Sequence, residues 1–254
     1  MKYFKNSSKM KAVTFSYDDG ITQDIRLITL LDKYGLKCTF NLNSELLNKK
    51  GILQRNGIPI SHYKIWKEDI KEVYGNHEIA VHTLTHPRLT ELPEDVIIRQ
   101  VEEDRKALSQ LAGYEVVGMA YPCGGVNNDD RVAEIIKNNT GVKYARTITS
   151  THSTEKQDNL YRFNPSFYHL DFDNMMEFGK KFVESDPQEK QILYVWGHSF
   201  EMDYAPENWI RLEEFFKLIS GKDDIFYGTN TQVLLKQKVG NKPTFCLIIN
   251  TVSR

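Results

Sequence analysis

The sequence predicts a barrel-like α/β fold with parallel strands. Short apolar or β-branched runs alternate with segments of helical periodicity about seven times along the 254 residues, a pattern typical of parallel sheets. Polar side chains follow several of the predicted strands, as they do at the catalytic rim of parallel barrels. No Pro-, Gly- or Ser-rich linker divides the chain, so we expect residues 1–254 to form one domain.

In the first half of the chain, strands are predicted at 11–17, 38–42 and 78–81, and helices at 22–34, 63–73 and 93–111. The first helix has Ile25, Ile28 and Leu31 at helical spacing. The third begins with Pro93, which suits a first helical turn, and is followed by Gly113, which suits a helix end.

In the second half, strands are predicted at 116–121, 142–148, 191–196, 224–227 and 244–249, and helices at 130–139, 172–183, 207–219 and 229–237. Residues 150–164 are polar and aperiodic. A loop of this length inside a compact fold is usually functional, so we expect it to contribute to a site or to an excursion from the barrel.

Composition limits the classes of function. A net charge of −1 gives no electrostatic basis for binding nucleic acid or an anionic membrane. Cysteines 38, 123 and 246 have no CxxC spacing and are odd in number, which favours a reducing compartment over a disulfide framework. We see neither a leader-like segment nor an apolar run of ~20 residues. We therefore expect a soluble cytoplasmic protein.

Two histidines with three residues between them follow the strand 78–81. His82 is predicted at the strand end, and His86 lies in a turn because it precedes Pro87. Two neutral imidazoles that face one point are half of a divalent metal site. The alternative is two unrelated histidines. Thr83 stands where a metalloprotease helix would carry Glu, so a catalytic base must come from elsewhere.

Asp18 and Asp19 follow the first strand and precede Gly20. Asp-Gly is also common turn chemistry, which is the alternative to a functional role. Gly20 allows the chain to swing, so both carboxylates could face one site despite strand alternation. In a parallel barrel these carboxylates would share one rim with the two histidines, with Cys123 and with His198.

Four motifs together resemble the polysaccharide deacetylases, which are carbohydrate esterase family 4 and share the NodB-homology domain. They are Thr14-Phe15-Ser16-Tyr17-Asp18-Asp19-Gly20, His82-Thr83-Leu84-Thr85-His86, Tyr121-Pro122-Cys123-Gly124, and His198 after an apolar strand. The resemblance extends from about residue 11 to residue 240. It implies a distorted (β/α)7 barrel that hydrolyses N- or O-acetyl groups on sugars with a divalent metal.

The resemblance also implies roles for individual residues. Asp19, His82 and His86 would be the metal ligands, Asp18 the general base and His198 the general acid. Two histidines and one carboxylate suit one Zn²⁺ ion best, while Co²⁺, Ni²⁺, Fe²⁺ and Mn²⁺ are alternatives.

The third motif departs from the family pattern. Ala120 stands where the family usually has an arginine that contacts the base, and Cys123 stands where an aromatic residue is usual. The resemblance makes the backbone N–H of Cys123, not its thiol, the oxyanion donor. Arg146, at the end of its strand, could replace the absent arginine; the alternative is an ordinary surface arginine. The family's tryptophan-containing fourth motif is not evident.

We expect His62, His77 and His152 to be surface or supporting residues, whereas His169 could line the cleft. The predicted function is metal-dependent removal of acetyl groups, by cleavage of a C–N amide bond, from an acetylated sugar or oligosaccharide. One alternative is an amidase that acts on a small non-sugar such as a ureide. Another is a non-catalytic sugar-binding module.

Overall fold

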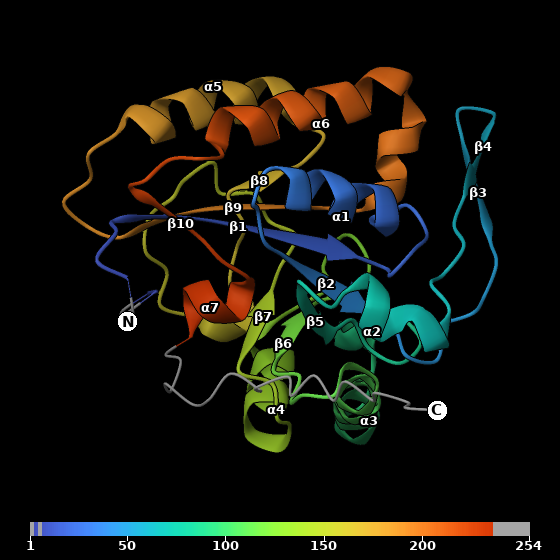
Figure 1. The fold of residues 1–254 in the computed structure, drawn as a ribbon. Coiled ribbons are helices and arrows are strands. Elements are labelled where there is room, and N and C mark those ends of the chain that lie inside the picture. Colours follow the sequence, from blue (N-terminus) through green and yellow to red (C-terminus); the bar gives the residue numbers. More distant parts are fainter. Residues whose placement is uncertain (1–2, 5–6, 236–254) are drawn as a thin grey trace, which may run out of the picture.

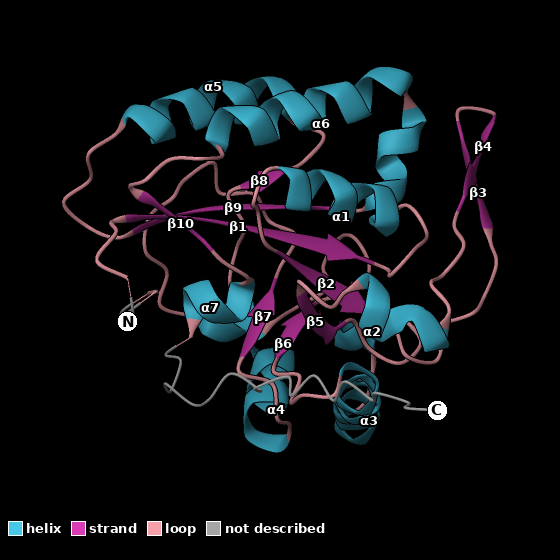
Figure 2. Cartoon of the chain, viewed as in Figure 1, coloured by secondary structure: helices cyan, strands magenta, loops and turns pink. Residues whose placement is uncertain are grey.

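A computed structural model describes residues 3–4 and 7–235 of the chain. Its centre is a curled, half-barrel sheet of eight strands in the order β7-β6-β5-β2-β1-β9-β8, with β10 also paired to β1 (Figures 1 and 2). Every pair of neighbouring strands in this sheet is parallel, which confirms the predicted α/β class and distorted barrel. The strands are β1 Lys11–Asp18, β2 Cys38–Leu42, β5 Glu78–Val81, β6 Gly118–Ala120, β7 Tyr144–Arg146, β8 Phe167–Tyr168, β9 Gln191–Gly197 and β10 Ile225–Tyr227.

β1 lies at the centre of the sheet, and all eight of its residues are buried. Side chains alternate between the two faces of a strand. Phe15 and Tyr17 belong to the apolar core, while Ser16 and Asp18 bond Arg146 on the other face. The interior of the half-barrel is therefore polar at its carboxyl end, which is where the last residue of β1 lies.

Helices cover the outer face of the sheet in two groups (Figure 2). α1 (Asp24–Lys33), α5 (Phe172–Glu184) and α6 (Pro206–Ile219) pack together beside β1 and β9, and α3 (Glu94–Ala112) packs on α4 (Asp130–Asn139) beside β5 and β6. The short α7 spans Asn230–Leu234. Gly113 ends α3 with a φ of 78°, as predicted from its freedom to adopt left-handed backbone.

The loop predicted at 150–164 helps to close the barrel. It contains a 3₁₀ turn at Leu160–Arg162 and leads into β8. The N–H of Phe163 donates to the carbonyl of Ala145 in β7 (2.9 Å), and that of Ser166 donates to the carbonyl of Tyr194 in β9 (2.7 Å). The segment thereby fills the gap between the two sides of the sheet.

The helix predicted at 63–73 is wrong over its first part. Only a 3₁₀ turn at Lys67–Asp69 and the four-residue α2 at Ile70–Val73 are helical. Lys64 instead forms an antiparallel bridge with Ile21, and the N–H of Ile65 donates to the carbonyl of Gly20 (2.9 Å). Long-range backbone pairing overrides the local apolar spacing here, and it brings Lys64 to the carboxyl rim.

A hairpin between residues 52 and 61 was not predicted. β3 (Ile52–Arg55) pairs antiparallel with β4 (Ile58–Ser61) and projects from the body of the molecule. Asn56 and Gly57 join the strands with φ values of 51° and 79°. An Asn-Gly pair with both residues at positive φ favours a tight hairpin turn, so the dipeptide was a usable signal.

The predicted apolar stripe of α1 is also partly wrong. Ile25 is 52% exposed, and the buried residues of this helix are Asp24, Leu27 and Leu31. The buried face of the helix thus begins with the carboxyl group of Asp24 and not with Ile25. The strand predicted at 244–249 and the end of the helix predicted at 229–237 lie outside the described residues. Among the described residues, no helix has both the length and the apolar character needed to cross a bilayer.

The packing of α6 on β1 gives a stability prediction. Phe216 is fully buried and its ring centroid lies 5.0 Å from that of Phe15. Phe216→Ala would leave a cavity, so we expect the free energy of unfolding to fall by about 3–5 kcal/mol. Ile210→Ala, on the same helix but at a residue that is 61% exposed, should change it by less than about 0.5 kcal/mol. Urea denaturation measures both; similar values for the two variants would contradict this packing.

Candidate active site

The carboxyl ends of the parallel strands surround a pocket of about 190 Å³. Six of the residues singled out in the sequence line it: Asp18, Asp19, His82, His86, Cys123 and His198. Arg146 contacts Asp18 from behind the pocket wall. Tyr121, Ile148 and Trp196 complete much of the wall. The structure thus brings together residues from β1, β5, β7, β9 and the loop after β6.

Asp19, His82 and His86 form a set of donor atoms suited to a metal ion. One donor atom from each lies within 4.8 Å of the other two, and Nε2 of His86 is 3.9 Å from Oδ1 of Asp19. Ligands about 2.0–2.2 Å from a tetrahedral ion lie roughly 3.4 Å apart. Small side-chain movements would therefore suffice for these atoms to share one ion.

The two imidazoles are held in the form that binds metals. Nδ1 of His82 lies 2.9 Å from the carbonyl oxygen of Ala120, so this nitrogen donates and the lone pair of Nε2 faces the pocket. Burial lowers the pKa of His82 to about 4, and burial also lowers the pKa of His86. Both rings are therefore neutral at pH 7, as metal ligation requires.

Unusual backbone aims the ligands at the pocket. Asp19, Thr83, His86 and Cys123 have φ values of 83°, 68°, 62° and 69°. Such conformations cost a residue with a side chain on the order of 1–3 kcal/mol and cluster at functional sites. The turn at Asp19 also explains how two consecutive carboxylates can line one pocket, which strand alternation alone forbids.

Asp18 forms a buried ion pair with Arg146. The Nη2 group of Arg146 contacts both carboxylate oxygens, and Nδ2 of Asn41 donates to Oδ1 (2.8 Å). Although burial favours protonation, the Arg146 guanidinium with His82 and His198 lowers the pKa of Asp18. Asp18 is therefore ionised at neutral pH. Arg146 is completely buried, so the alternative of a surface arginine is wrong.

The guanidinium of Arg146 is fixed on all sides. Its Nε donates to Ser16 (3.2 Å) and its Nη1 to the carbonyl of Thr147 (3.0 Å). Its Cζ lies 4.5 Å from the ring centroid of Trp196, in a cation–π arrangement. An arginine from β7 and a tryptophan from β9 thus lie together at the site.

His198 faces Asp18 across the pocket, with its Nε2 3.9 Å from Oδ2 of that residue. Its Nδ1 lies 3.1 Å from Oε2 of Glu201. Burial acts to lower the pKa of His198, but Glu201 and Asp18 raise it to about 9. His198 therefore carries a proton at pH 7. Glu201 was not predicted from the sequence, although its spacing of three residues from His198 was a usable signal.

The remaining histidines lie as follows. His169 does not line the pocket: it is fully buried behind Glu201, with Nε2 2.7 Å from Oε2 of that carboxylate. Nε2 of His62 lies 3.3 Å from Oδ2 of Asp19, in a supporting position. His152 is exposed, and His77 lies at the opposite end of the barrel.

Lys64 was missed because a helix was predicted there. Its Nζ donates to the carbonyl oxygen of Asp19 (2.7 Å) and to Oδ1 of the same residue (3.1 Å). With His62, it lowers the pKa of Asp19 well below its ordinary range, against the opposing effect of burial. Asp19 is therefore a carboxylate at neutral pH, as a metal ligand must be.

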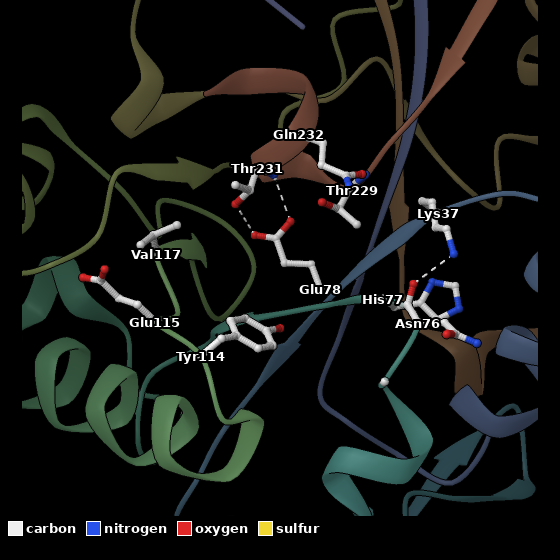
Figure 3. Close-up of a pocket in the computed structure, with 11 residues that line it drawn as sticks. Lys37, Asn76, His77, Glu78, Tyr114, Glu115, Val117, Thr229, Thr231 and Gln232 are labelled. Carbon is white, nitrogen blue, oxygen red and sulfur yellow. Dashed lines mark hydrogen bonds between the residues drawn. The ribbon is translucent and has the colours of Figure 1, made fainter. Parts of the chain in front are cut away.

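A second hollow, of about 280 Å³, lies at the amino end of β5 (Figure 3). Its central carboxylate is Glu78, and His77 and Tyr114 also line it. The oxygens of Glu78 accept hydrogen bonds from Thr39, Tyr144 and Thr231. Since this carboxylate is already saturated by neutral donors, the hollow does not share the chemistry of the carboxyl rim.

Comparison with known sequences identifies the family. A profile described as polysaccharide deacetylase matches residues 5–145, which is more than half of the chain. The chain belongs to the polysaccharide deacetylase family. The resemblance inferred from the motifs is thereby confirmed.

Curated deacetylase sequences are similar to this chain over part of their length. A peptidoglycan-N-acetylglucosamine deacetylase of Listeria monocytogenes is 26% identical over 129 residues, which are 50% of this chain and 24% of that protein. A bifunctional xylanase/deacetylase of Pseudobutyrivibrio xylanivorans is 26% identical over 126 residues, or 48% and 18%. The chain thus matches about a quarter or less of these longer deacetylases.

Solved structures of polysaccharide deacetylases share the fold. The Xyl-CE4 domain of a multidomain xylanase from the hindgut metagenome of Trinervitermes trinervoides is 16% identical, with a TM-score of 0.56 over 87% of this chain and 88% of that one. A family 4 carbohydrate esterase from Streptomyces lividans is 12% identical, with a TM-score of 0.54 over 91% and 100%.

The contact between His198 and Glu201 gives a pH prediction. The pKa of His198 is about 9 in the folded chain, against an ordinary value of 6.5. Protonation of this residue therefore stabilises the fold fully below pH 6.5, and that contribution is lost as the pH rises through 9. In Glu201→Gln the pKa of His198 should fall, and the loss of stability between pH 6.5 and 9 should become smaller.

NMR titration of the histidine rings and urea denaturation at the two pH values measure these effects in metal-free protein. Glu207→Gln, at an exposed residue in the first turn of α6, is the matched control. An unchanged titration of His198 in Glu201→Gln would contradict this reading of the pair.

Proposed function

We propose that this protein removes the acetyl group from an N-acetylated sugar or oligosaccharide, using one divalent metal ion held by Asp19, His82 and His86. One observation carries the proposal: an ionised Asp18 and a protonated His198 lie 3.9 Å apart beside these ligands. A base and an acid separated in this way suit hydrolysis of an amide, which needs a proton removed from water and a proton given to nitrogen.

The bound ion would polarise the acetyl carbonyl and lower the pKa of a coordinated water molecule to about 7. Zn²⁺ fits two neutral imidazoles and a carboxylate best, with Co²⁺, Ni²⁺, Fe²⁺ and Mn²⁺ as alternatives. Oδ2 of Asp18 lies 4.0 Å from Nε2 of His82, which places the base next to a ligand nitrogen. Asp18 would accept the proton of the attacking water, and Arg146 keeps that carboxylate ionised until it does.

His198 would donate its proton to the departing amine. Its Nε2 faces the pocket side of Asp18, and Glu201 lies against its Nδ1. Among the described residues, no hydrogen bond uses the backbone N–H of Cys123, so this donor is free to stabilise the oxyanion, an effect worth about 3–4 kcal/mol. Burial raises the pKa of the Cys123 thiol, which disfavours a role as nucleophile.

Two observations support an acetylated sugar as substrate, one for the sugar and one for the acetyl group. The curated relatives include deacetylases named for peptidoglycan N-acetylglucosamine and for xylan-degrading activity. Tyr121, Ile148 and Trp196 give the small pocket apolar walls, which suit the methyl group of an acetyl. The same water activation could serve O-acetyl esters or a small ureide, so the substrate panel must include them.

The test is acetate release from N-acetylglucosamine oligomers and acetylated xylo-oligosaccharides, with a cyclic ureide scored for ring opening. We expect zinc-loaded protein to release acetate, and a chelator to abolish it. His82→Ala should lose metal affinity by at least about 100-fold, since it removes a ligand rather than a supporting group. His152→Ala, at an exposed residue, should keep both metal and activity.

Hydrolysis of the ureide alone would replace the proposal with the amidase alternative. Binding of the oligosaccharides without hydrolysis of any compound, in fully metal-loaded protein, would indicate the non-catalytic alternative.

The pair of Arg146 and Asp18 gives a further prediction. Arg146→Ala should raise the pKa of Asp18, since an opposite charge at contact distance is lost. The acidic limb of the profile of kcat/KM against pH should therefore move to higher pH. The free energy of unfolding should fall by about 3–5 kcal/mol, because the variant leaves a buried charge unpaired.

Arg99→Ala, at an exposed residue of α3, is the control for loss of a positive charge. If Arg146→Ala is too unstable to assay, Arg146→Lys retains a cation but not the two-oxygen contact, and should give a smaller shift in the same direction. An acidic limb that does not move in either variant would remove Arg146 from the mechanism.

A further inference from the structure

A buried carboxyl group lies beneath the active site, at the start of α1. Asp24 is completely buried. Its Oδ1 accepts a hydrogen bond from the hydroxyl of Ser199 (2.5 Å), and its Oδ2 accepts from the hydroxyl of Tyr74 (2.7 Å) and the N–H of Ile21 (3.2 Å). Every one of these donors is neutral.

Burying a carboxyl group among neutral donors is costly. Burial raises the pKa of Asp24 to about 7, although its three hydrogen bonds act in the opposite direction. An apolar residue would pack at this position without that cost. Core packing alone therefore does not explain a carboxyl group at this position, whereas the location of its hydrogen-bond partners does.

The hydrogen-bond partners of Asp24 lie next to pocket residues from two different strands. Ile21 ends the turn that contains Asp19, and Ser199 directly follows His198 in the chain. Tyr74 lies at the end of α2, and its ring packs on Phe40 in the core (4.8 Å between centroids). Asp24 thus connects the core, through Tyr74, with the two turns that carry Asp19 and His198.

We infer that Asp24 is a positioning residue, and that its hydrogen bond to Ser199 holds the imidazole of His198 in place relative to Asp18 and Asp19. The inference rests on the proposed function, since it assigns His198 the proton transfer. The side chain of His198 is fixed by Glu201 in its own turn, and His169 holds Glu201 from the side of β8. The bond from Ser199 to Asp24 anchors the same turn on its other side, to α1 and hence to the end of β1.

Two variants separate positioning from simple stability. Ser199→Ala and Tyr74→Phe each remove one hydroxyl donor from the same carboxyl group, and each leaves one of its oxygens with fewer partners. Only Ser199 lies in the turn that carries His198. We therefore expect both variants to lower the melting temperature, and only Ser199→Ala to disturb proton donation.

The readout is the ratio of kcat for an N-acetyl sugar to kcat for an aryl acetate in zinc-loaded enzyme. The amine leaving group needs the proton of His198, whereas a phenolate leaves without it. Displacement of a catalytic group by about 1 Å can cost up to 100-fold, so we expect the ratio to fall at least about tenfold in Ser199→Ala. It should be unchanged in Tyr74→Phe, and zinc affinity should be unchanged in both.

Ser199→Thr retains the hydroxyl and should restore most of the ratio. Equal falls in Ser199→Ala and Tyr74→Phe, or no fall in either, would overturn the inference while leaving the proposed function intact. If the wild-type enzyme releases no acetate, the proposed function fails instead. The ring ¹⁵N shifts of His198 then decide the positioning role: they should change in Ser199→Ala and not in Tyr74→Phe, and unchanged shifts in Ser199→Ala would refute it.

Discussion

The buried ion pair of Asp18 and Arg146 is the interaction on which the site depends. Removing two charges from water costs several kcal/mol per ion, and this is offset only where geometry is good and the remaining polar groups are satisfied. Asn41, Ser16 and the carbonyl of Thr147 provide those partners. The ends of β1, β2 and β7 are therefore fixed relative to one another, because a shift in any of them would leave a charge in the interior without a partner.

That requirement shows how the sheet and the site depend on each other. Parallel pairing brings the strand ends to one rim, and the curl of the sheet brings β7 opposite β1 across the interior. Alternation along β1 then points Asp18 at Arg146, while the left-handed backbone at Asp19 (φ 83°) turns the next carboxylate toward His86. Two adjacent aspartates thereby reach different partners. Asp18 contacts the guanidinium of Arg146, whereas Asp19 lies beside Lys64 and the imidazoles of His62 and His86.

Local sequence predicted much of this arrangement and could not predict the rest. The parallel α/β class followed from the alternation of strand-like and helix-like periodicity, and the candidate ligand set followed from two short motifs, around Asp19 and at His82–His86, that resemble those of a known family. Lys64 and the hairpin at 52–61 were missed, although Asn56-Gly57 signalled a turn. Lys64 pairs with Ile21, which lies 43 residues earlier in the chain, and the hydrophobic periodicity of neither segment indicates this pairing. Arg146 was suggested only by the absence of an arginine at Ala120, because the partner of a buried charge is a property of the fold.

One small pocket can hold a candidate acid and a candidate base because a different neighbour stabilises the charge of each. Asp18 is kept ionised by Arg146 on β7, while His198 is kept protonated by Glu201 in its own turn. A divalent ion beside Asp19 would oppose protonation of His198, since like charges disfavour each other at this distance. The raised pKa of His198, about 9 without the ion, acts against that effect. Glu201, which also contacts His169, thus places a negative charge beside His198 that none of the motif residues provides.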